Sequence, residues 1–221
     1  MMEHSSDHSS MLLLLLCCAA AQAQQQFDVL VYGATSGGVV AGVAASRHGA
    51  RVGLLVANGG GCGPSAAGSN HIGGMSSSGL GKTDIGAAAH EHLVGGVAAE
   101  FYSLNAAHYN TTAPPSWDHE PQVAQASFDR LLANSTVTIL RGGHGANVAH
   151  VEKDGKRIVA LHTADGRVLG ADIFVDASYE GDLLAAAGGS YVVGRESTLR
   201  YNESAAGRRA DDFNGGESSR P

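Results

Sequence analysis

Near its start the chain has two short apolar runs on either side of a stretch rich in Ala and Val. The first run, residues 27–32, ends at Gly33; the stretch, residues 39–48, contains no Pro; the second run covers residues 51–56. Runs of this length favour buried strands, and the stretch between them is long enough for about three helical turns. Strand, tight turn, helix and strand within about thirty residues is the order of a βαβ unit in a doubly wound sheet.

The middle of the chain has the spacing of two helices. Residues 84–107 are rich in Ala, and apolar side chains at intervals of four, four and three predict one helical face: Leu93, Val97, Phe101 and Leu104. His90 and His92 lie two positions apart in this segment, so they point to different sides of a helix and do not favour a metal site. A second helix is expected from Glu120 to about Leu132.

Further strands are expected after these helices. Residues 136–140 predict a third parallel strand, and residues 146–175 predict an antiparallel meander. Its turns fall at the Asp-Gly pairs 154–155 and 165–166, which are typical of β-hairpins. The last strand, residues 173–175, is expected to rejoin the parallel sheet.

The length and composition indicate one α/β domain, or one and a fraction. The chain has 221 residues, of which 43% are hydrophobic and 16% charged, so it carries enough apolar surface to form a core. Its 31 glycines are about twice the usual share. The formal net charge is -7 and Lys and Arg do not cluster, which argues against nucleic acid or an anionic membrane surface as the main partner.

Residues 1–23 are expected to be a secretory signal peptide. Residues 11–16 form an apolar run, small residues continue it, and residues 21–23 fit the rule for cleavage before Gln24. No Lys or Arg precedes the run, where a signal normally begins basic, so Met11 is an alternative start. Because the run is far shorter than the ~20 residues that span a bilayer, no stable membrane span is expected. The predicted location is secreted or the secretory-pathway lumen.

The chain that would remain after cleavage has one cysteine, and its glycosylation triplets agree with secretion. Removal of the signal would take away Cys17 and Cys18 and leave Cys62 without another cysteine, so no disulfide within the chain is expected. Three triplets have the pattern of N-glycosylation acceptors and predict a glycoprotein; they begin at Asn110, Asn134 and Asn202.

The turn after the first strand, GATSGG, is a candidate site for a dinucleotide diphosphate. Glycine at its start allows a tight turn, and glycine at its end lets the helix lie close to the sheet. The first amides of the helix then point at one spot with the helix dipole behind them, which suits a pyrophosphate. The candidate contacts are Gly33, Thr35, Ser36, Gly37 and Gly38.

Two positions depart from the G-x-G-x-x-G fingerprint of dinucleotide-binding turns. Thr35 stands at the middle glycine, and Val56 stands where an acid would bind a ribose. Asn58 is a candidate for that ribose contact instead. The alternative is a βαβ packing unit without a ligand, but the continued glycine spacing at Gly42 and Gly49 favours dinucleotide binding.

Residues 58–86 have few large side chains and no apolar periodicity, and they include HIGGMSSSGLGKTDIG from His71 to Gly86. A stretch this long inside a compact domain is usually functional or disordered. Its glycines let backbone approach a flat group, and its serines offer short hydrogen-bonding groups. A surface loop is the alternative.

Several sequence pieces in a fixed order carry a resemblance to a known family. They are DVLVYGATSGG from Asp28, HIGGMSSSGLGKTD from His71, EPQVA from Glu120, FVDASYEGDLLAAAG from Phe174, and VGRES and YNESAAG before residue 208. With them the chain resembles the FAD-dependent oxidoreductases of the glutathione-reductase-like flavoproteins with two dinucleotide-binding domains, over about residues 27–207.

The resemblance implies FAD as the cofactor and an α/β fold: a Rossmann-like FAD-binding domain with a parallel sheet and an antiparallel β-meander. In this superfamily the meander distinguishes FAD-binding from nicotinamide-binding domains. The resemblance places the glycine-rich segment beside the pyrophosphate and the flavin ring, with candidate contacts Gly73, Gly74, Met75, Ser77, Ser78 and Gly79. It also places Val148 at the adenine, and Asp176, Ala177 and Ser178 over the nucleotide.

Family members are longer, so the resemblance implies a truncated member whose substrate domain is incomplete. The expected organisation is a signal peptide at residues 1–23, an FAD-binding domain at 24–207 and an irregular tail at 208–221.

The expected activity is that of an FAD-dependent oxidoreductase, with hydride transfer between a small-molecule substrate and flavin. Lys82 and Asp84 are candidate polar groups near the predicted ring edge, and no catalytic acid or base is assigned. Glu180 and Asp182 either serve the site or cap a helix that begins near Asp182. His71 is expected to be a surface histidine with no covalent link to flavin; the resemblance leaves covalent attachment as the alternative, because some relatives attach FAD through a histidine in a comparable loop. The alternative is a catalytically inactive nucleotide-binding remnant or partner-binding fragment.

Overall fold

The computed structural model describes residues 24–57, 71–83, 85, 93–110, 117–143, 146–194, 196–204 and 206–207. Within the chain, contacts define two compact units, Met1–Gly189 and Ser190–Pro221. The expected domain boundary after residue 207 lies further along the chain than this division. Several positions considered above lie outside the described residues: the segments 1–23 and 208–221, Asn58, Cys62, Asp84, His90 and His92.

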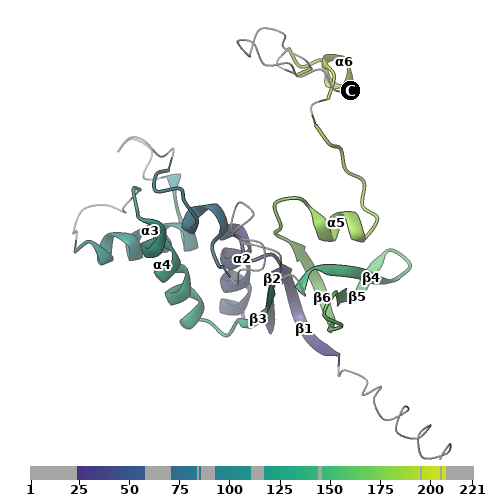
Figure 1. The fold of residues 1–221 in the computed structure, drawn as a ribbon, viewed down its shortest axis with the longest axis horizontal. Coiled ribbons are helices and arrows are strands. Elements are labelled where there is room, and N and C mark those ends of the chain that lie inside the picture. Colours follow the sequence, from purple (N-terminus) through teal and green to yellow (C-terminus); the bar gives the residue numbers. More distant parts are fainter. Residues whose placement is uncertain are drawn as a thin grey trace, which may run out of the picture. The chain divides into compact units, whose positions relative to one another are not determined.

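The described part of the first unit is built on one six-stranded sheet with the order β3-β2-β1-β6-β5-β4 (Figure 1). Its parallel part consists of β1 (Gln25–Tyr32), β2 (Val52–Ala57), β3 (Thr138–Gly143) and β6 (Val168–Asp176). Its antiparallel part adds β4 (Val148–Asp154) and β5 (Arg157–Thr163). The predicted α/β class, with a parallel sheet and a meander, is confirmed.

Strand β6 is longer than expected and joins the two parts of the sheet. It pairs in parallel with β1 from Gln25↔Leu169 to Tyr32↔Asp176, and its first half also pairs antiparallel with β5. Both Asp-Gly turns of the meander are confirmed, with φ of +60° at Gly155 and +88° at Gly166. Because β6 continues from the meander into the parallel sheet, its end at Asp176 lies beside the end of β1.

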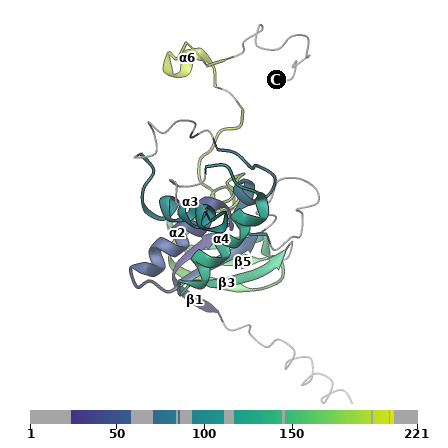
Figure 2. The same cartoon turned by 90° about the vertical axis from the view of Figure 1, so that its left-hand side faces the viewer.

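Helices pack on one side of the sheet, as Figure 2 shows for α2 (Ser36–Arg47), α3 (Gly96–His108) and α4 (Pro121–Ala133). The remaining helical elements are η2 (Gly74–Ser77), α5 (Asp182–Ala186) and, in the second unit, α6 (Thr198–Tyr201). None of the described helices is both long enough and apolar enough to cross a membrane.

The prediction for α3 was wrong at its beginning. The helix starts at Gly96, so Leu93 lies before it and is 70% exposed, whereas Phe101 is buried as expected. The cause is the pair Gly95-Gly96: Gly95 is extended and Gly96 has φ of +59°, a backbone conformation that does not continue a helix.

The core fills both faces of the sheet. Between the sheet and the helices lie Val31, Val39, Val43, Leu54, Phe128 and Leu131. Under the other face lie Leu30, Tyr32, Leu55, Leu161, Leu169 and Leu183, the last contributed by α5. All six residues of β2 are buried, because this strand has a neighbour on each side and a core on each face.

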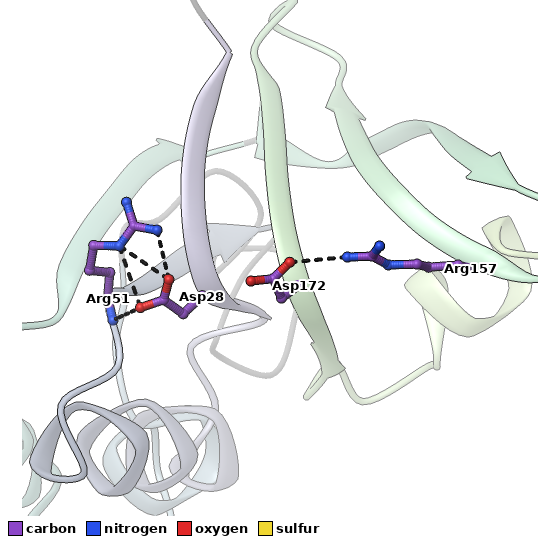
Figure 3. A network of polar contacts seen from close by, with 4 residues as sticks. All are labelled: Asp28, Arg51, Arg157 and Asp172. Atoms are coloured by element: carbon purple, nitrogen blue, oxygen red, sulfur yellow. Dashed lines mark hydrogen bonds and ion pairs between the residues drawn. The ribbon is translucent and has the colours of Figure 1, made fainter.

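Two ion pairs lie level with the amino end of β2, beside the middle of β1 and β6 (Figure 3). Arg51 donates to both carboxylate oxygens of Asp28 through its side chain, and its backbone N–H donates to Asp28 Oδ2 at 2.7 Å. On the neighbouring strands, Arg157 Nη2 lies 3.0 Å from Asp172 Oδ1. Asp28 and Asp172 occupy equivalent positions of β1 and β6, since their neighbours pair Phe27↔Ala171 and Val29↔Ile173.

Candidate cofactor-binding site

The turn between β1 and α2 has the tight geometry that the sequence predicts. Gly33 has φ of +102°, and a Cβ there would lie 2.8 Å from the carbonyl carbon of Ala177. A Cβ at Gly38 would clash with the carbonyl oxygen of Gly33. Both positions therefore require glycine, and the predicted backbone roles of the two residues are confirmed.

Thr35, the departure from the fingerprint, caps the helix. Its Oγ1 accepts a hydrogen bond from the Gly38 amide at 3.2 Å and donates to the carbonyl oxygen of Ala177 at 2.8 Å. A threonine in the N-cap position satisfies one of the otherwise unpaired first-turn amides. Here the same hydroxyl also ties the turn to the loop after β6, which a glycine could not do.

The start of α2 remains open to an anion. The first turn carries no acidic side chain, Ser36 is half-buried, and Gly37 is exposed. A Cβ at Gly37 would meet only Thr35 Oγ1, at 3.8 Å, and the Gly37 amide has no acceptor among the described residues. A free amide, open space and the positive end of the helix dipole suit a diphosphate, so these residues fit the pyrophosphate of FAD.

The glycine-rich segment 71–83, called the ribbon below, docks beside this helix start. The Gly73 amide donates to the Ala34 carbonyl at 2.8 Å, and Thr35 and Gly73 form a parallel β-bridge. Gly73 has φ of +101°, and a Cβ there would clash with Phe128 of α4 and with Ser77. The ribbon is thus packed between the βαβ turn and α4, and the surface-loop alternative does not apply to this part of it.

Inside the ribbon, serine hydroxyls bond to nearby carbonyls. Ser77 Oγ donates to the Ile72 carbonyl at 2.6 Å, and Ser78 Oγ donates to the Gly74 carbonyl at 2.7 Å. His71 Nε2 lies 2.9 Å from Ser77 Oγ. Because the Ser77 proton is used toward Ile72, the histidine nitrogen is the donor in that contact. These two serines shape the 3₁₀ turn η2; Ser77 is 3% exposed and its oxygen already accepts from His71, whereas Ser78 is half-buried.

Two other predicted ribbon contacts face outward. Met75 is 43% exposed, and Gly79, with φ of +123°, has no atom within 4 Å of where its Cβ would lie. Lys82 forms an isolated antiparallel bridge with Asp118, which joins the end of the ribbon to the segment before α4. The ribbon therefore presents a soft apolar side chain and open backbone on its exposed side.

The loop after β6 completes the site as a third segment. Asp176 Oδ1 accepts from the amide and hydroxyl of Ser178, at 3.0 and 2.7 Å, and Asp176 Oδ2 accepts from the Leu184 amide at 2.8 Å. Ser178 Oγ accepts from the amides of Gly181 and Asp182, both at 3.0 Å. These two side chains bond to the first amides of α5, and Asp182 is the acidic residue in the first turn of that helix, as the helix-start interpretation expects.

The acids of this loop influence one another. Burial raises the pKa of Asp182 above its ordinary value, and the nearby carboxylates of Asp176 and Glu180 add to the effect. Burial also raises the pKa of Tyr32, with a further contribution from Asp182 and Asp176. The Tyr32 hydroxyl accepts a hydrogen bond from the Val148 amide at 3.2 Å. The amide of Val148, predicted to lie at the adenine, is thus engaged with the end of β1.

Two residues that organise the ribbon were not predicted from the sequence. His119 is 6% exposed; its Nε2 lies 3.1 Å from the Ser76 carbonyl, and its backbone N–H donates to the Gly81 carbonyl at 2.9 Å. Tyr179 accepts a hydrogen bond from the Met75 amide at 2.7 Å. His119 lies directly before EPQVA and Tyr179 lies within DASYEGD, but the two motifs give no sign of these contacts.

The site thus brings together the turn after β1, the ribbon and the loop after β6. Of the predicted contacts, only Asn58 lies outside the described residues. Among the described residues, no three His, Cys, Asp or Glu side chains are arranged to hold a metal ion.

Comparisons with known proteins agree with the fold. The structure is similar to L-proline dehydrogenase from P. horikoshii, with a TM-score of 0.52 and 12% identity, covering 78% of this chain and 59% of that one. It is also similar to the flavin-dependent brominase Bmp2, with a TM-score of 0.51 and 16% identity, covering 74% of this chain and 41% of that one. The chain therefore spans less than two thirds of either protein. No curated protein is a significant sequence match.

A family model adds the sequence-level assignment. The model described as FAD dependent oxidoreductase matches residues 28–214, which include the turn, the ribbon and the loop after β6. The chain belongs to the FAD-dependent oxidoreductase family, and it contains the FAD-binding portion of that fold.

Proposed function

We propose that this chain is the cofactor-binding portion of an enzyme that transfers hydride between a small organic molecule and FAD. The observation that carries the proposal is the bridge between Thr35 and Gly73, which sets the ribbon beside the start of α2. When bound, FAD supplies the redox chemistry, and the protein supplies binding and orientation.

Each segment has a separate part in binding. The exposed amide of Gly37 and the dipole of α2 would hold the diphosphate. The ribbon backbone from Gly73 to Gly79 would lie along the flavin, because Met75 is exposed on this stretch and glycine leaves the backbone uncovered at Gly79. Ala177 and Ser178 support the turn from the other side, through Gly33 and Thr35.

The test is a spectrum of residues 24–221 produced without the signal segment. We expect flavin absorption bands that remain with the protein on gel filtration and are released on denaturation, or that appear after FAD is added and the excess removed. Protein that is correctly folded, colourless and indifferent to added FAD would contradict the proposal. Reduction of the bound flavin by candidate donors, followed as bleaching of the visible band, then tests hydride transfer.

We also propose that the protein enters the secretory pathway and carries N-linked glycans. The proposal is supported by the signal-like segment 1–23 and by exposure of Asn134 and Asn202 in their acceptor triplets. Expression of the full chain in a eukaryotic secretory host should give a protein that begins at Gln24 and loses mass on treatment with an N-glycosidase. Retention of Met1 together with no change in mass would contradict it.

A further inference from the structure

A single phenol joins two of the three segments of the site. The Met75 amide in the ribbon donates to Tyr179 Oη at 2.7 Å, although the two residues are 104 positions apart in the chain. Met75 lies in η2, and Tyr179 lies between the end of β6 and the start of α5. This contact is the tie between the ribbon and the loop after β6.

The loop side of the tie is held firmly. Ala177 receives the hydroxyl of Thr35 at 2.8 Å, and its carbonyl group lies against Gly33 so closely that no side chain fits there. Ser178, directly before Tyr179, is fixed by Asp176, and its Oγ accepts from the amides of Gly181 and Asp182, which follow the tyrosine. The backbone on either side of the tyrosine is therefore anchored to the βαβ turn and to α5.

The ribbon side is held less firmly at the position of the tie. Gly73 is bonded to Ala34, but the Met75 side chain is 43% exposed and Gly74 has φ of +57°. Few apolar contacts therefore fix residue 75. Tyr179 is itself 46% exposed and belongs to neither buried core cluster of the described residues, so the ring contributes little to the stability of the fold.

We propose that Tyr179 is a positioning residue: its hydroxyl holds the Met75 amide and thereby sets the ribbon in the arrangement that receives FAD. The inference rests on the proposed function, because it assigns the ribbon to the cofactor. The oxygen is the essential atom, since an amide at this exposed position otherwise exchanges with water. The tie raises the affinity for FAD by ordering the ribbon before the cofactor arrives.

The decisive variant is Tyr179→Phe in the chain from Gln24, which keeps the ring and removes the acceptor. In the protein without FAD, hydrogen exchange at the Met75 amide should become about 3- to 10-fold faster, the change expected for loss of one ordinary hydrogen bond. The dissociation constant for FAD, measured by fluorescence titration, should rise by a similar ~3- to 10-fold factor. The visible circular dichroism of bound flavin should change, because the ribbon beside it is no longer fixed.

The matched control is Tyr191→Phe. Tyr191 is 62% exposed, lies in the second unit and has no hydrogen bond among the described residues. It should leave Met75 exchange, FAD affinity and the flavin dichroism unchanged. Thermal unfolding of both variants should match the starting protein, which separates positioning from a general loss of stability.

Three outcomes would overturn the inference. If Tyr179→Phe leaves both Met75 exchange and FAD affinity unchanged while the starting protein binds FAD, the inference fails and the proposed function stands. If FAD binds more tightly to the variant, Tyr179 obstructs the cofactor and does not position the ribbon for it. If the starting protein binds no FAD, the proposed function fails and the inference with it, and the exchange measurement still shows whether the tie exists.

Discussion

The two ends of the parallel strands differ in whether their acidic side chains have ion-pair partners. At the amino end, Asp28 and Asp172 each have an arginine partner, and the pair with Arg51 holds the pKa of Asp28 below its ordinary value (Figure 3). At the carboxyl end, Asp176 and Asp182 have no ion pair among the described residues, and the pKa of Asp182 is raised.

The same contrast holds for backbone groups. At the amino end, the Arg51 amide is bonded to Asp28, so a charged side chain closes the start of β2. At the carboxyl end, α2 begins with an exposed Gly37 amide and no acid in its first turn. At the amino end, called the closed end below, the charged side chains are paired with one another and need no ligand. The carboxyl end, called the open end below, offers hydrogen-bond donors and space beside glycines. In open α/β sheets, ligands bind outside the carboxyl ends of the strands. This protein fits that rule, because the charged groups at the amino end are already paired and the amide at the start of α2 is exposed.

The largest test of this contrast places an acid at the open end. Gly37→Asp should weaken FAD binding by about 100-fold or more, because the new carboxylate faces the diphosphate in a site where backbone amides supply the attraction. The same change should leave the protein without FAD folded, since an acid in the first turn of a helix interacts favourably with its dipole. Fluorescence titration and thermal unfolding measure the two effects.

The control for that variant is Gly37→Ala. A methyl group there meets only Thr35 Oγ1 at 3.8 Å, so the fold accommodates it. FAD affinity should fall by far less than in Gly37→Asp. If the two variants weaken binding equally, the loss is steric, and the electrostatic account of the open end is wrong.

The open end could be located from the sequence, but the hydrogen bonds that join its segments could not. Short-range signals sufficed for the βαβ turn, since glycine spacing reports backbone geometry within a few residues. The contact of Thr35 with Ala177 joins residues 142 positions apart, and no local pattern encodes it. Likewise His119 reaches Ser76 only because α4 and the ribbon pack together. The start of α3 was missed because helical spacing outweighed the Gly-Gly pair.

His119 provides a second, smaller test at the open end. His119→Phe keeps an aromatic ring beside Phe101 but removes the hydrogen bond to the Ser76 carbonyl. We expect FAD affinity to fall by about 5- to 10-fold, the range for loss of one hydrogen bond to a buried group. Fluorescence titration measures it, and Tyr102→Phe is the control, because it changes a neighbouring aromatic without touching the ribbon bond. Equal affinities for His119→Phe and the starting protein would show that the histidine only fills space.

At the closed end the expected effect concerns stability and not cofactor binding. Asp28 has a pKa below its ordinary value of 3.8, chiefly through the side-chain hydrogen bond from Arg51. Its contribution to stability is therefore present above pH 3.8 and is lost as the pH falls through the folded-state pKa. Asp28→Asn should lower the melting temperature at pH 7 and flatten its fall below pH 4, with FAD affinity unchanged. Asp129→Asn, on the surface of α4, serves as the matched control. A loss of FAD binding in Asp28→Asn would remove the distinction between the two ends.

The smallest effect is the opposite pH dependence at Asp182. Its pKa is raised above 3.8, first by burial and then by Asp176 and Glu180, so the folded state binds the proton more tightly than the unfolded chain does. The stabilising contribution is complete below the unfolded value and disappears as the pH rises through the folded-state pKa. Asp182→Asn removes this dependence and relieves repulsion at pH 7, so the melting temperature there should rise by about 1–2 °C. Asp28→Asn is expected to lower the melting temperature at pH 7. The sign of the change in melting temperature, measured for both variants in one buffer series, therefore distinguishes the two ends of the sheet. A fall in both variants would show that the caps on α5 depend on the Asp182 charge, and that the carboxyl end is held by its acids as the amino end is.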